Sequence, residues 1–481
     1  MKGHRPPDGY NHGLLFLLPK KLTGLVSDTR PLSVTNTDNR LLASCVSRSI
    51  MDAVVGYVHP AQKGFLAGKL GSDDVVDINA LFYGAVVNKM SKLLFLLDTA
   101  KDFDTIDHDW VTHVLSKAGF PLWLRNFVEG AFSSVKVSPF FGGPLSVWID
   151  ILRGVKQGCP LSPLLFVIAY DLLLDRLAGL GSFVPFAFAD DLALFADSVS
   201  AISPALVVID EFSRVSGLGV NKDKSVAIPT AGEESWLSIS NELLASPWPD
   251  LPLRASGTHL GILIGREVTL GMLWKGPIEK ASERLKKNGA LIRSLSLTSR
   301  MLYMNVFIVS LFSYLGLFFV LPHELWLVVK GLVASFFPFR GRAYSYESLV
   351  CSQQIFSVKP ALKDVWAFNV SLLAVRSPLF VSPPRNSAQL VRPDLTDCMF
   401  IHVHRDAAAY DFWRFHQLPD GRLVSPSPPT SSRVYKIIVE GFFLEDAVRK
   451  VGSKISNFLA KNDPSCPPPS SSRCPLGHCR R

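Results

Sequence analysis

The chain has 481 residues, of which 48% are hydrophobic, and carries a net charge of +9. This length predicts two to four domains with cores large enough to fold without disulfide bonds. The seven cysteines have no paired spacing and no secretory signal precedes them, which predicts a reducing compartment, cytoplasm or nucleus, and argues against a disulfide-rich secreted protein. The basic bias is compatible with a nucleic-acid partner without establishing one.

The first elements alternate between apolar runs and punctuating residues. Residues 1–13 are polar and rich in Gly, Pro and His, which predicts a flexible N-terminus, and a strand over 14–18 follows. A helical pattern covers about 39–54, and Lys92 to Asp98 reads as a buried strand. Asp107 or Asp109 is expected to cap a helix that runs to about Ala118, before Gly and Pro end it.

The middle of the chain has clear turn signals. Residues 154–163 predict a tight loop that opens a helix, with Ser162 as the N-cap and Pro163 at the first helical position. Residues 184–195 predict a hairpin whose turn carries Asp190 and Asp191. A basic amphipathic helix is expected over 278–292, and two packed helices over 301–337. Residues 462–481 are rich in Pro and Ser, which predicts a disordered tail.

One apolar run has two interpretations. Met301 to Leu321 contains 21 residues without a charged side chain, which is long enough for a membrane span. It also contains Asn305 and Ser313, basic residues cluster only before it, and no second such run accompanies it. Periodicity alone does not separate a span from a buried helix. The sequence favours a buried helix, with a membrane-associated protein as an alternative.

Three carboxylates end apolar runs that read as buried strands. Asp98 ends one run, and Asp190 and Asp191 interrupt another. Buried carboxylates are costly unless they are paired or bind a metal. Two strands that each carry Asp at one end could hold two divalent cations about 3.5–4 Å apart, as phosphoryl transfer between nucleotides requires. Mg²⁺ suits such a site because a few carboxylates and substrate phosphates are enough to bind it.

Further short segments accompany these carboxylates in a characteristic order. They cover residues 17–21 with 30–33, 62–69, 98–104, 154–163, 188–191, 217–225, 259–265 and 296–300. These segments resemble motifs of the reverse transcriptases of non-LTR (LINE-type) retrotransposons. In chain order they correspond to the fingers motif, a segment found only in this branch of reverse transcriptases, motifs A to D, the primer grip and the start of the second thumb helix. The similarity covers about residues 14–265 and continues more loosely to about 345.

This resemblance implies an α+β fold of the right-hand polymerase type, with a mostly antiparallel palm sheet and a helical thumb. The expected organisation is a flexible stretch over 1–13, fingers and palm over 14–265, a thumb over 270–345, a region of unclear fold over 346–461, and the tail over 462–481. The implied activity is RNA-directed DNA synthesis. Its implied partners are an RNA template, a DNA primer and dNTPs, with two Mg²⁺ ions, or Mn²⁺, as cofactor and no stable membrane association.

The resemblance also implies a role for individual residues. Asp98, Asp190 and Asp191 would bind the metals, and Lys224 would protonate the pyrophosphate leaving group. Phe103 would exclude the 2′-hydroxyl of ribonucleotides. The other residues expected to contact the nucleotide are Lys20, Lys21, Arg30, Gln157 and Gly158. Residues expected to contact the template–primer backbone are Lys280, Arg284, Lys286, Lys287 and Arg293, with Arg300 facing the same way.

Several points stay open at the level of sequence. Asp102 stands where the family usually has Ala, and the sequence begins at the fingers without room for an endonuclease, so a catalytically decayed relic remains an alternative to an active enzyme. Residues 102–106 also resemble the phospho-aspartate motif of haloacid-dehalogenase phosphatases, but Ile106 stands where that motif needs Thr or Val, which argues against it. The spacing of Cys466, Cys474, His478 and Cys479 is poor for a zinc knuckle. The oligomeric state is not determined.

Overall fold

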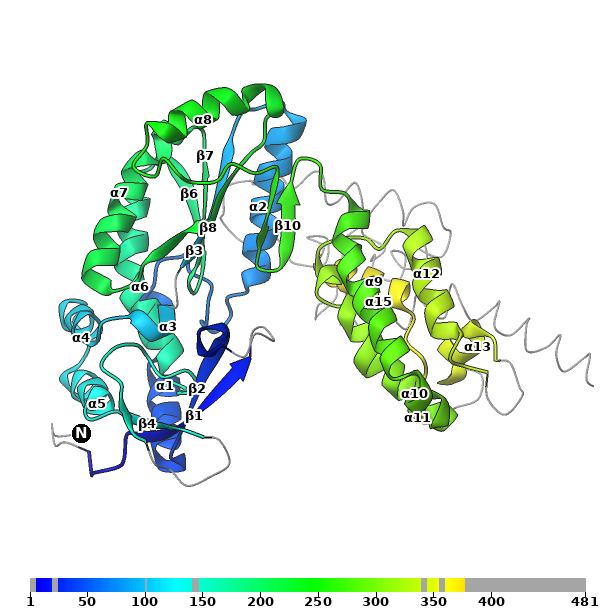
Figure 1. Cartoon of the computed structure of the whole chain (residues 1–481), viewed down its shortest axis with the longest axis horizontal. Coiled ribbons are helices and arrows are strands. Elements are labelled where there is room, and N and C mark those ends of the chain that lie inside the picture. Colours follow the sequence, from blue (N-terminus) through cyan, green and yellow to red (C-terminus); the bar gives the residue numbers. More distant parts are fainter. Residues whose placement is uncertain are drawn as a thin grey trace, which may run out of the picture. The chain divides into compact units, whose positions relative to one another are not determined.

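The computed structural model describes residues 6–19, 25–99, 102–140, 147–338, 344–353 and 360–376. The chain divides into two compact units, the first ending at Val268 and the second beginning at Thr269 (Figure 1). The predicted cysteine and histidine group at 466–479, the predicted tail and most of the predicted region 346–461 lie outside the described residues.

A four-stranded antiparallel sheet forms the centre of the first unit. Its order is β6-β7-β3-β8, and its strands are β3 (Leu93–Thr99), β6 (Phe183–Phe188), β7 (Asp191–Ala196) and β8 (Val220–Pro229). The first five residues of β3 are all buried, which explains why this strand reads as a continuous apolar run rather than an alternating one. The sequence predictions of the strand at 92–98 and of the hairpin at 184–195 are confirmed.

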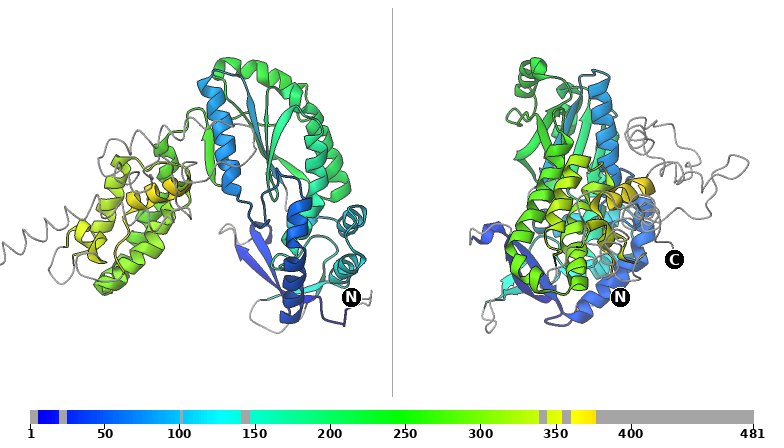
Figure 2. Two further views of the ribbon diagram at one scale, coloured as in Figure 1. Left: turned by 180° about the vertical axis from the view of Figure 1, so that it is seen from behind. Right: turned by 90° about the vertical axis from the view of Figure 1, so that its right-hand side faces the viewer.

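Helices cover both faces of this sheet. Helices α6 (Ser162–Ala178) and α7 (Val199–Ser216) lie on one face and α2 (Gly71–Val87) on the other (Figures 1 and 2). Most residues of α6 are buried on every side, from Leu164 to Leu177, as expected for a helix at the centre of a large core. Helix α8 (Trp236–Leu244) and the hairpin β9 (Ser256–His259) and β10 (Ile262–Gly265) complete the unit.

A second sheet, of order β2-β1-β4-β5, lies in the part of the unit that holds the N-terminal strands. Strand β1 pairs antiparallel with β2 and parallel with β4. The strands are β1 (His12–Pro19), β2 (Thr29–Thr35), β4 (Lys136–Pro139) and β5 (Ile149–Asp150). The helices near it are α1 (Thr37–Tyr57), α3 (Asp102–Thr105), α4 (His108–Lys117) and α5 (Leu122–Phe132) (Figure 1). An antiparallel central sheet and a second, mixed sheet, both accompanied by helices, make an α+β fold, as predicted.

Two predicted helix starts have different outcomes. Asp107 caps α4, since its carboxylate accepts hydrogen bonds from the backbone N–H groups of Asp109 and Trp110. The prediction for α6 is wrong by one residue, because Leu161 is the N-cap and Ser162 already lies inside the helix. The backbone N–H of Ser162 donates to the carbonyl of Cys159, so the preceding turn, not a side-chain cap, starts this helix.

The second unit contains helices whose bounds differ from those that the sequence predicted. They are α9 (Leu270–Lys287), α10 (Gly289–Ser294), α11 (Leu297–Tyr303), α12 (His323–Ala334), α13 (Tyr346–Val350) and α15 (Val365–Arg376). The helix expected over 278–292 begins earlier and breaks at Asn288. The first of the two helices expected over 301–337 is not one continuous α-helix. Instead, α11 is followed by a π-helical turn (Met304–Ile308) and by 3₁₀ turns (Val309–Phe312 and Leu315–Leu317).

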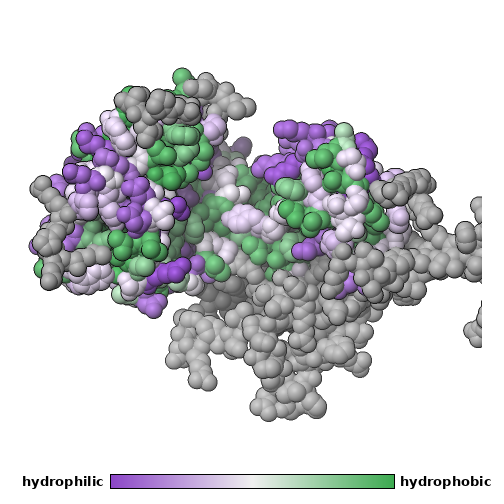
Figure 3. Space-filling view, turned by 90° about the horizontal axis from the view of Figure 1, so that it is seen from below, coloured by the Kyte–Doolittle hydropathy of each residue, from purple (hydrophilic) through white to green (hydrophobic). Residues whose placement is uncertain are grey.

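Polar groups inside the apolar stretch account for these breaks. Asn305 donates to the carbonyl of Ala361 and accepts from the N–H of Lys363, so this side chain is bound to a distant loop. Among the described residues, no helix is long and apolar enough to cross a membrane. On the face that Figure 3 presents, hydrophilic and hydrophobic residues are mixed over the described surface.

Candidate active site

Two of the three candidate metal-binding carboxylates lie on neighbouring strands. Strand β3 pairs antiparallel with β7 up to the pair Leu97 and Leu192, and one further step of this register places Asp98 opposite Asp191. Directly opposed residues have Cβ atoms about 4.5–5.5 Å apart. The fold therefore brings together two residues that are 93 positions apart in the sequence.

Asp190 lies in the turn between β6 and β7. The pairing of Phe188 with Asp191 leaves a loop of two residues, Ala189 and Asp190. The hydroxyl of Thr99, which follows Asp98, donates a hydrogen bond of 3.1 Å to the carbonyl of Asp190. This bond ties the turn to the end of β3, so all three carboxylates belong to one edge of the central sheet.

The electrostatics of the three carboxylates show their proximity. The pKa of Asp191 is raised to about 6, first by burial and then by the negative charges of Asp190 and Asp98. Asp98 is 41% exposed as a side chain, yet its Oδ2 atom is buried and accepts no hydrogen bond. The lone pairs of a buried carboxylate oxygen without a hydrogen-bond donor are stabilised by a nearby cation or by a proton.

Lys224 supplies a positive charge at this edge. It lies on β8, which pairs with β3 on the side away from β7, and its Nζ is 3.5 Å from Asp98 Oδ2. The Lys224 side chain is 68% exposed, so the ion pair itself adds little to stability. The hydroxyl of Ser225 accepts a 3.1 Å bond from the N–H of Asp98, which fixes the strand end that carries this carboxylate.

The carboxylates alone do not form a complete metal cage. Among the described residues, no group of three or more His, Cys, Asp or Glu side chains is arranged to hold a metal ion. Sites for Mg²⁺ commonly use one or two carboxylates together with substrate phosphates and waters. Asp98 Oδ2, which accepts no hydrogen bond, and the neighbouring Asp191 fit such an incomplete site.

Phe103 belongs to a cluster of aromatic rings behind the carboxylates. Its ring stacks on Phe166 of α6 with centroids 4.9 Å apart and meets Phe65 edge-on at 5.9 Å. The ring is half-buried, so one part of it packs in the core while another part reaches the surface. This fixed, partly exposed ring has the rigidity that a steric filter needs.

The loop expected to contact the nucleotide is fastened to the segment that follows Asp98. The amide of Gln157 donates a 3.0 Å bond to Asp104 Oδ1, and the N–H of Val155 donates a 2.7 Å bond to the carbonyl of Phe103. His108 also reaches this loop, since its Nε2 lies 2.7 Å from the carbonyl of Gly154. Asp104 and His108 were not singled out from the sequence, because nothing in their spacing points to a loop 50 residues away.

Gly158 lies against strand β2. Its φ is +107°, and a Cβ atom there would come within 2.8 Å of the carbonyl oxygen of Ser33. Only glycine fits both conditions without strain. The N–H of Ser33 donates to the carbonyl of Gln157, so this loop joins the sheet that carries Arg30.

Arg30 is exposed, and Lys20 and Lys21 lie outside the described residues, as does the side chain of Asp102.

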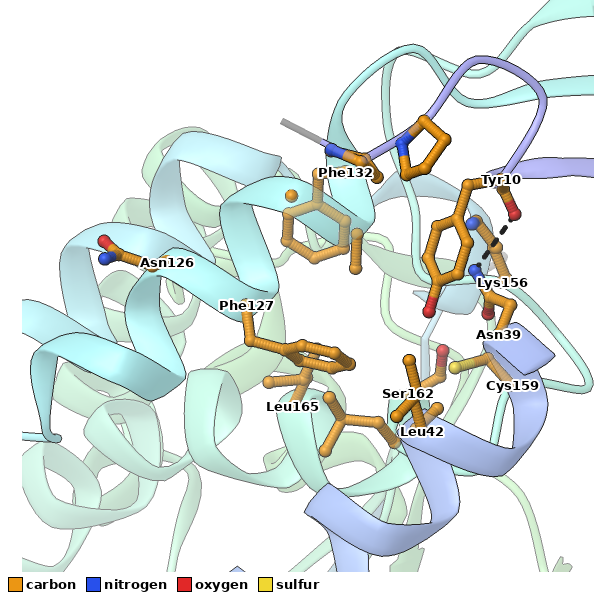
Figure 4. Close-up of a pocket in the computed structure, with 16 residues that line it drawn as sticks. Tyr10, Asn39, Leu42, Asn126, Phe127, Phe132, Lys156, Cys159, Ser162 and Leu165 are labelled. Carbon is orange, nitrogen blue, oxygen red and sulfur yellow. Dashed lines mark hydrogen bonds between the residues drawn. The ribbon is translucent and has the colours of Figure 1, made fainter. Parts of the chain in front are cut away.

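Lys156 lines a cavity of the first unit. This cavity of about 330 Å³ is lined mainly by apolar side chains of α1, α5 and α6 and by the segment before β1. Figure 4 shows Phe127 and Phe132 across the cavity from Tyr10, with Lys156, Asn39 and Cys159 on the side of Tyr10. The Nζ atom of Lys156 has a long contact of 3.4 Å with Asn11 Oδ1. Burial lowers the pKa of Lys156 from 10.5 to about 8.

Replacing Lys156 by methionine is expected to raise the melting temperature at pH 7. The folded chain holds this proton less tightly than the unfolded chain, so the charge destabilises the fold below pH 8. The destabilisation by the Lys156 charge decreases as the pH rises from about 8 towards 10.5. The increase in melting temperature from the substitution should therefore decrease over the same range. Thermal unfolding at pH 7 and pH 9, with the exposed Lys287→Met as a control, measures both effects. A lower melting temperature at pH 7 would contradict this.

The basic residues of α9 and α10 lie on the surface of the second unit. Leu273, Trp274, Ala281 and Leu285 form the buried face of α9. The five cations expected to contact nucleic acid are all exposed: Lys280, Arg284, Lys286, Lys287 and Arg293. Two of them also contact the protein, since Arg284 donates to the carbonyl of Phe307 and Arg293 lies over the ring of Phe336.

Arg300 does not face outward, contrary to the sequence prediction. It is 4% exposed and donates hydrogen bonds to backbone carbonyls of Arg293, Leu295, Phe336 and Pro338. A guanidinium has five donors in a planar fork, which suits it to join several chain segments at once. Arg300 is therefore a structural residue that connects α10, α11 and the segment after α12.

The chain is similar to known proteins of the reverse transcriptase family and of retrotransposons. The sequence model of the reverse transcriptase (RNA-dependent DNA polymerase) family matches residues 18–240. The chain is 29% identical over 295 residues to the Pol polyprotein of the type-1 retrotransposable element R2 of Popillia japonica, covering 56% of this chain and 40% of that protein. It is 29% identical over 224 residues to the corresponding R2DM polyprotein of Drosophila melanogaster, covering 45% of this chain and 21% of that protein.

Other relatives are more distant or cover less. The chain is 28% identical over 230 residues to a 149 kDa protein of the transposon TX1 of Xenopus laevis, covering 46% of this chain and 18% of that protein. Among solved structures, apo telomerase of Candida tropicalis is similar with a TM-score of 0.40 and 12% identity, covering 96% of this chain and 69% of that one. The chain thus spans less than half the length of each of these retrotransposon proteins.

Proposed function

We propose that this chain, whose residues 18–240 are a reverse transcriptase domain of the non-LTR retrotransposon type, is an RNA-directed DNA polymerase. It would extend the 3′-hydroxyl end of a DNA primer with dNTPs on an RNA template. The observation that carries the proposal is the edge of the central sheet, where Asp98 and Asp191 lie opposite each other and the turn with Asp190 joins them. Both strands lie inside the segment that matches the family.

The three carboxylates would hold the metal ions. Two Mg²⁺ ions, or Mn²⁺, would supply the activation of the primer hydroxyl and the stabilisation of the leaving pyrophosphate. The buried Oδ2 of Asp98 accepts no hydrogen bond and has only the exposed Lys224 ammonium, 3.5 Å away, as a partner, which a metal ion would replace. Burial and the negative charges of Asp190 and Asp98 raise the pKa of Asp191. A bound cation would neutralise the repulsion among the three carboxylates, so cation binding is favourable here.

The neighbouring residues would orient the nucleotide. Phe103 would lie against the sugar and exclude a 2′-hydroxyl, since stacking on Phe166 fixes its ring. Arg30, together with Lys20 and Lys21, would bind the triphosphate, for which a guanidinium offers paired donors. Lys224, 3.5 Å from Asp98, would donate its proton to the pyrophosphate. Gln157 and Gly158 would form the wall on the template side.

A primer-extension assay tests the proposed activity. The full chain is incubated with an RNA template, an annealed DNA primer, dNTPs and Mg²⁺, and the products are separated by length, with Asp190→Ala as the inactive control. We expect extension to the end of the template by the wild type alone. Absence of extension by a folded wild-type chain would instead favour a relic that keeps the fold, for which the substitution at Asp102 would be one cause.

Because the cations of α9 are exposed, we expect the affinity for template–primer to depend on the salt concentration. Reversing two charges, Lys286→Glu with Lys287→Glu, should weaken template–primer binding and reduce the slope of log K against log salt by roughly two, because each lost phosphate contact removes about one counterion. Fluorescence anisotropy of a labelled duplex across a salt series measures this slope.

The matched control for this charge reversal carries Lys89→Glu and Lys117→Glu, two exposed positions of the first unit that change the net charge equally. An unchanged slope in the α9 variant, or an equal change in the control, would contradict a specific role of this helix. Flotation of the intact protein with neutral liposomes provides the second check, and we expect no retention.

A further inference from the structure

The segment Ala61–Gly64 forms an additional edge of the central sheet. The N–H of Ala187, on β6, donates a 3.1 Å bond to the carbonyl of Ala61, and the N–H of Lys63 donates a 2.8 Å bond to the carbonyl of Ala187. Gln62 forms a parallel bridge with Ala187. This short segment therefore runs beside the strand that leads into the turn with Asp190.

The side chain of Gln62 closes that turn. It is fully buried, and its Oε1 accepts a 2.7 Å bond from the N–H of Ala189 while its Nε2 donates a 3.1 Å bond to the carbonyl of the same residue. Oε1 also accepts a 2.8 Å bond from the N–H of Gly64. One amide thus satisfies both backbone groups of a residue 127 positions away.

The turn needs such support because its first residue is strained. Ala189 has a φ of +56°, a region that costs an L-residue roughly 1–2 kcal/mol and that glycine adopts freely. Two-residue hairpin loops with a positive φ at the first position usually have Gly there. A strained backbone persists only where its surroundings over-determine it, and the amide of Gln62 restrains both backbone groups of Ala189.

The surrounding contacts hold the Gln62 segment itself in place. A Cβ atom on residue 64 would collide with the backbone nitrogen of Ala189, so Gly64 allows the two backbones to touch. On the other side, Lys63 forms a 2.8 Å ion pair with Asp74 of α2, whose side chain is fully buried. The segment is therefore bound to the turn by Gln62 and to a helix by Lys63.

We propose that Gln62 is a positioning residue, whose buried amide holds the Ala189–Asp190 turn in the strained conformation that places the carboxylate of Asp190 beside those of Asp98 and Asp191. The proposal rests on the proposed polymerase function and assigns to Gln62 the geometry of its metal site. Gln62 itself does not touch substrate or metal. Loss of the amide would let Ala189 relax to negative φ and turn the Asp190 side chain away.

Gln62→Met tests this, because methionine has a similar size but makes none of the three hydrogen bonds. We expect kcat to fall by on the order of tenfold or more and the Mg²⁺ concentration for half-maximal activity to rise, while the Kd for template–primer stays within about twofold of wild type. If Gln62→Met does not fold, Gln62→Asn keeps an uncharged amide but shortens the side chain by one methylene group, which weakens its bonds to both backbone groups of Ala189, and the same changes are expected to a smaller extent.

A second substitution separates positioning from simple stabilisation. Ala189→Gly should restore part of the lost kcat in the Gln62→Met chain, because glycine adopts the positive φ without the clamp, and should change the wild type little. The matched control is Asn369→Leu in the second unit. Asn369 is also a buried amide with three backbone hydrogen bonds, to Gly316, Phe319 and Leu321, and its loss should lower the melting temperature without changing the Mg²⁺ requirement.

The outcomes distinguish this proposal from the polymerase function. Wild-type kcat and Mg²⁺ requirement in Gln62→Met, or no recovery with Ala189→Gly, would reduce Gln62 to a structural residue. If the wild type shows no incorporation, calorimetric titration with Mn²⁺ replaces the activity readout. Weaker Mn²⁺ binding in Gln62→Met than in wild type would then support the positioning role while the polymerase proposal fails. Equal binding, or none in both chains, would overturn the positioning role.

Discussion

Replacing Asp98 or Asp190 by asparagine is expected to abolish DNA synthesis without destabilising the protein. Each substitution removes a charged metal ligand, and we expect the rate of incorporation to fall by roughly a thousandfold or more, about 4 kcal/mol of transition-state stabilisation. Stability should be similar or higher, because burial and, after it, the negative charges of Asp190 and Asp98 raise the pKa of Asp191 to about 6, and asparagine removes one of these charges.

Two measurements on the same preparations check this prediction. Single-nucleotide incorporation on an RNA template gives the rate, and thermal unfolding without metal gives the stability. Asp197→Asn provides the matched control, since Asp197 follows the other end of β7 and pairs with Lys92 on the surface. Wild-type incorporation by Asp98→Asn or Asp190→Asn would refute the metal-site assignment. A large fall in melting temperature would show that the carboxylates stabilise the fold instead of straining it.

Replacing Phe103 by alanine should weaken the exclusion of ribonucleotides. The ring is fixed between Phe166 and Phe65, and its removal opens the space that a 2′-hydroxyl would occupy. The ratio of kcat/KM for a dNTP to that for the matching rNTP should fall by roughly tenfold to a hundredfold. The main contribution should be faster rNTP incorporation, because a steric filter acts against the wrong substrate and not for the correct one.

Phe103→Tyr is the control for this substitution, because it keeps the ring and should keep the discrimination. Competition between dNTP and rNTP on one template measures the ratio directly. Equal ratios in wild type and Phe103→Ala would show that Phe103 only fills the core between α6 and the segment around Phe65.

The sequence was sufficient to predict three of the four strands of the central sheet, β3, β6 and β7, and the meeting of its carboxylates, but not strand β8. Apolar runs such as residues 93–97 give a clear strand signal, and an Asp at the end of each run suggests a shared site because an isolated buried carboxylate is costly. The motif order then predicted the α+β fold. These signals are local in the chain, and their spatial meeting follows from the antiparallel pairing of two hydrophobic strands.

Other parts of the site depend on contacts that no local pattern reveals. The amide of Gln62 reaches Ala189 across 127 residues, and only the structure shows the positive φ that it supports. Arg300 reads as one more cation in a basic run, yet it is buried among carbonyl groups of three segments. Lys156 likewise lies within the loop 154–163, directly before Gln157, but lines an apolar cavity. A charge run does not specify which of its members point inward.

The helices of the second unit were harder to predict for a related reason. The uncharged run 301–321 carries no internal stop signal, so its sequence resembles one long helix. The structure breaks it where Asn305 binds a loop near Ala361 and Gly316 packs against Asn369. These breaks are set by partners 50 or more residues away, and the hydrophobic pattern contains no trace of them.

The most direct test of the central claim is template-directed choice of a single nucleotide. The full chain is given a DNA primer annealed to an RNA template, Mg²⁺ and one dNTP at a time, and incorporation is followed over a single turnover. The account predicts rapid addition of the dNTP complementary to the template base, slow addition of the other three, and no addition by Asp98→Asn. Addition that ignores the template base, or that persists in Asp98→Asn, would contradict it.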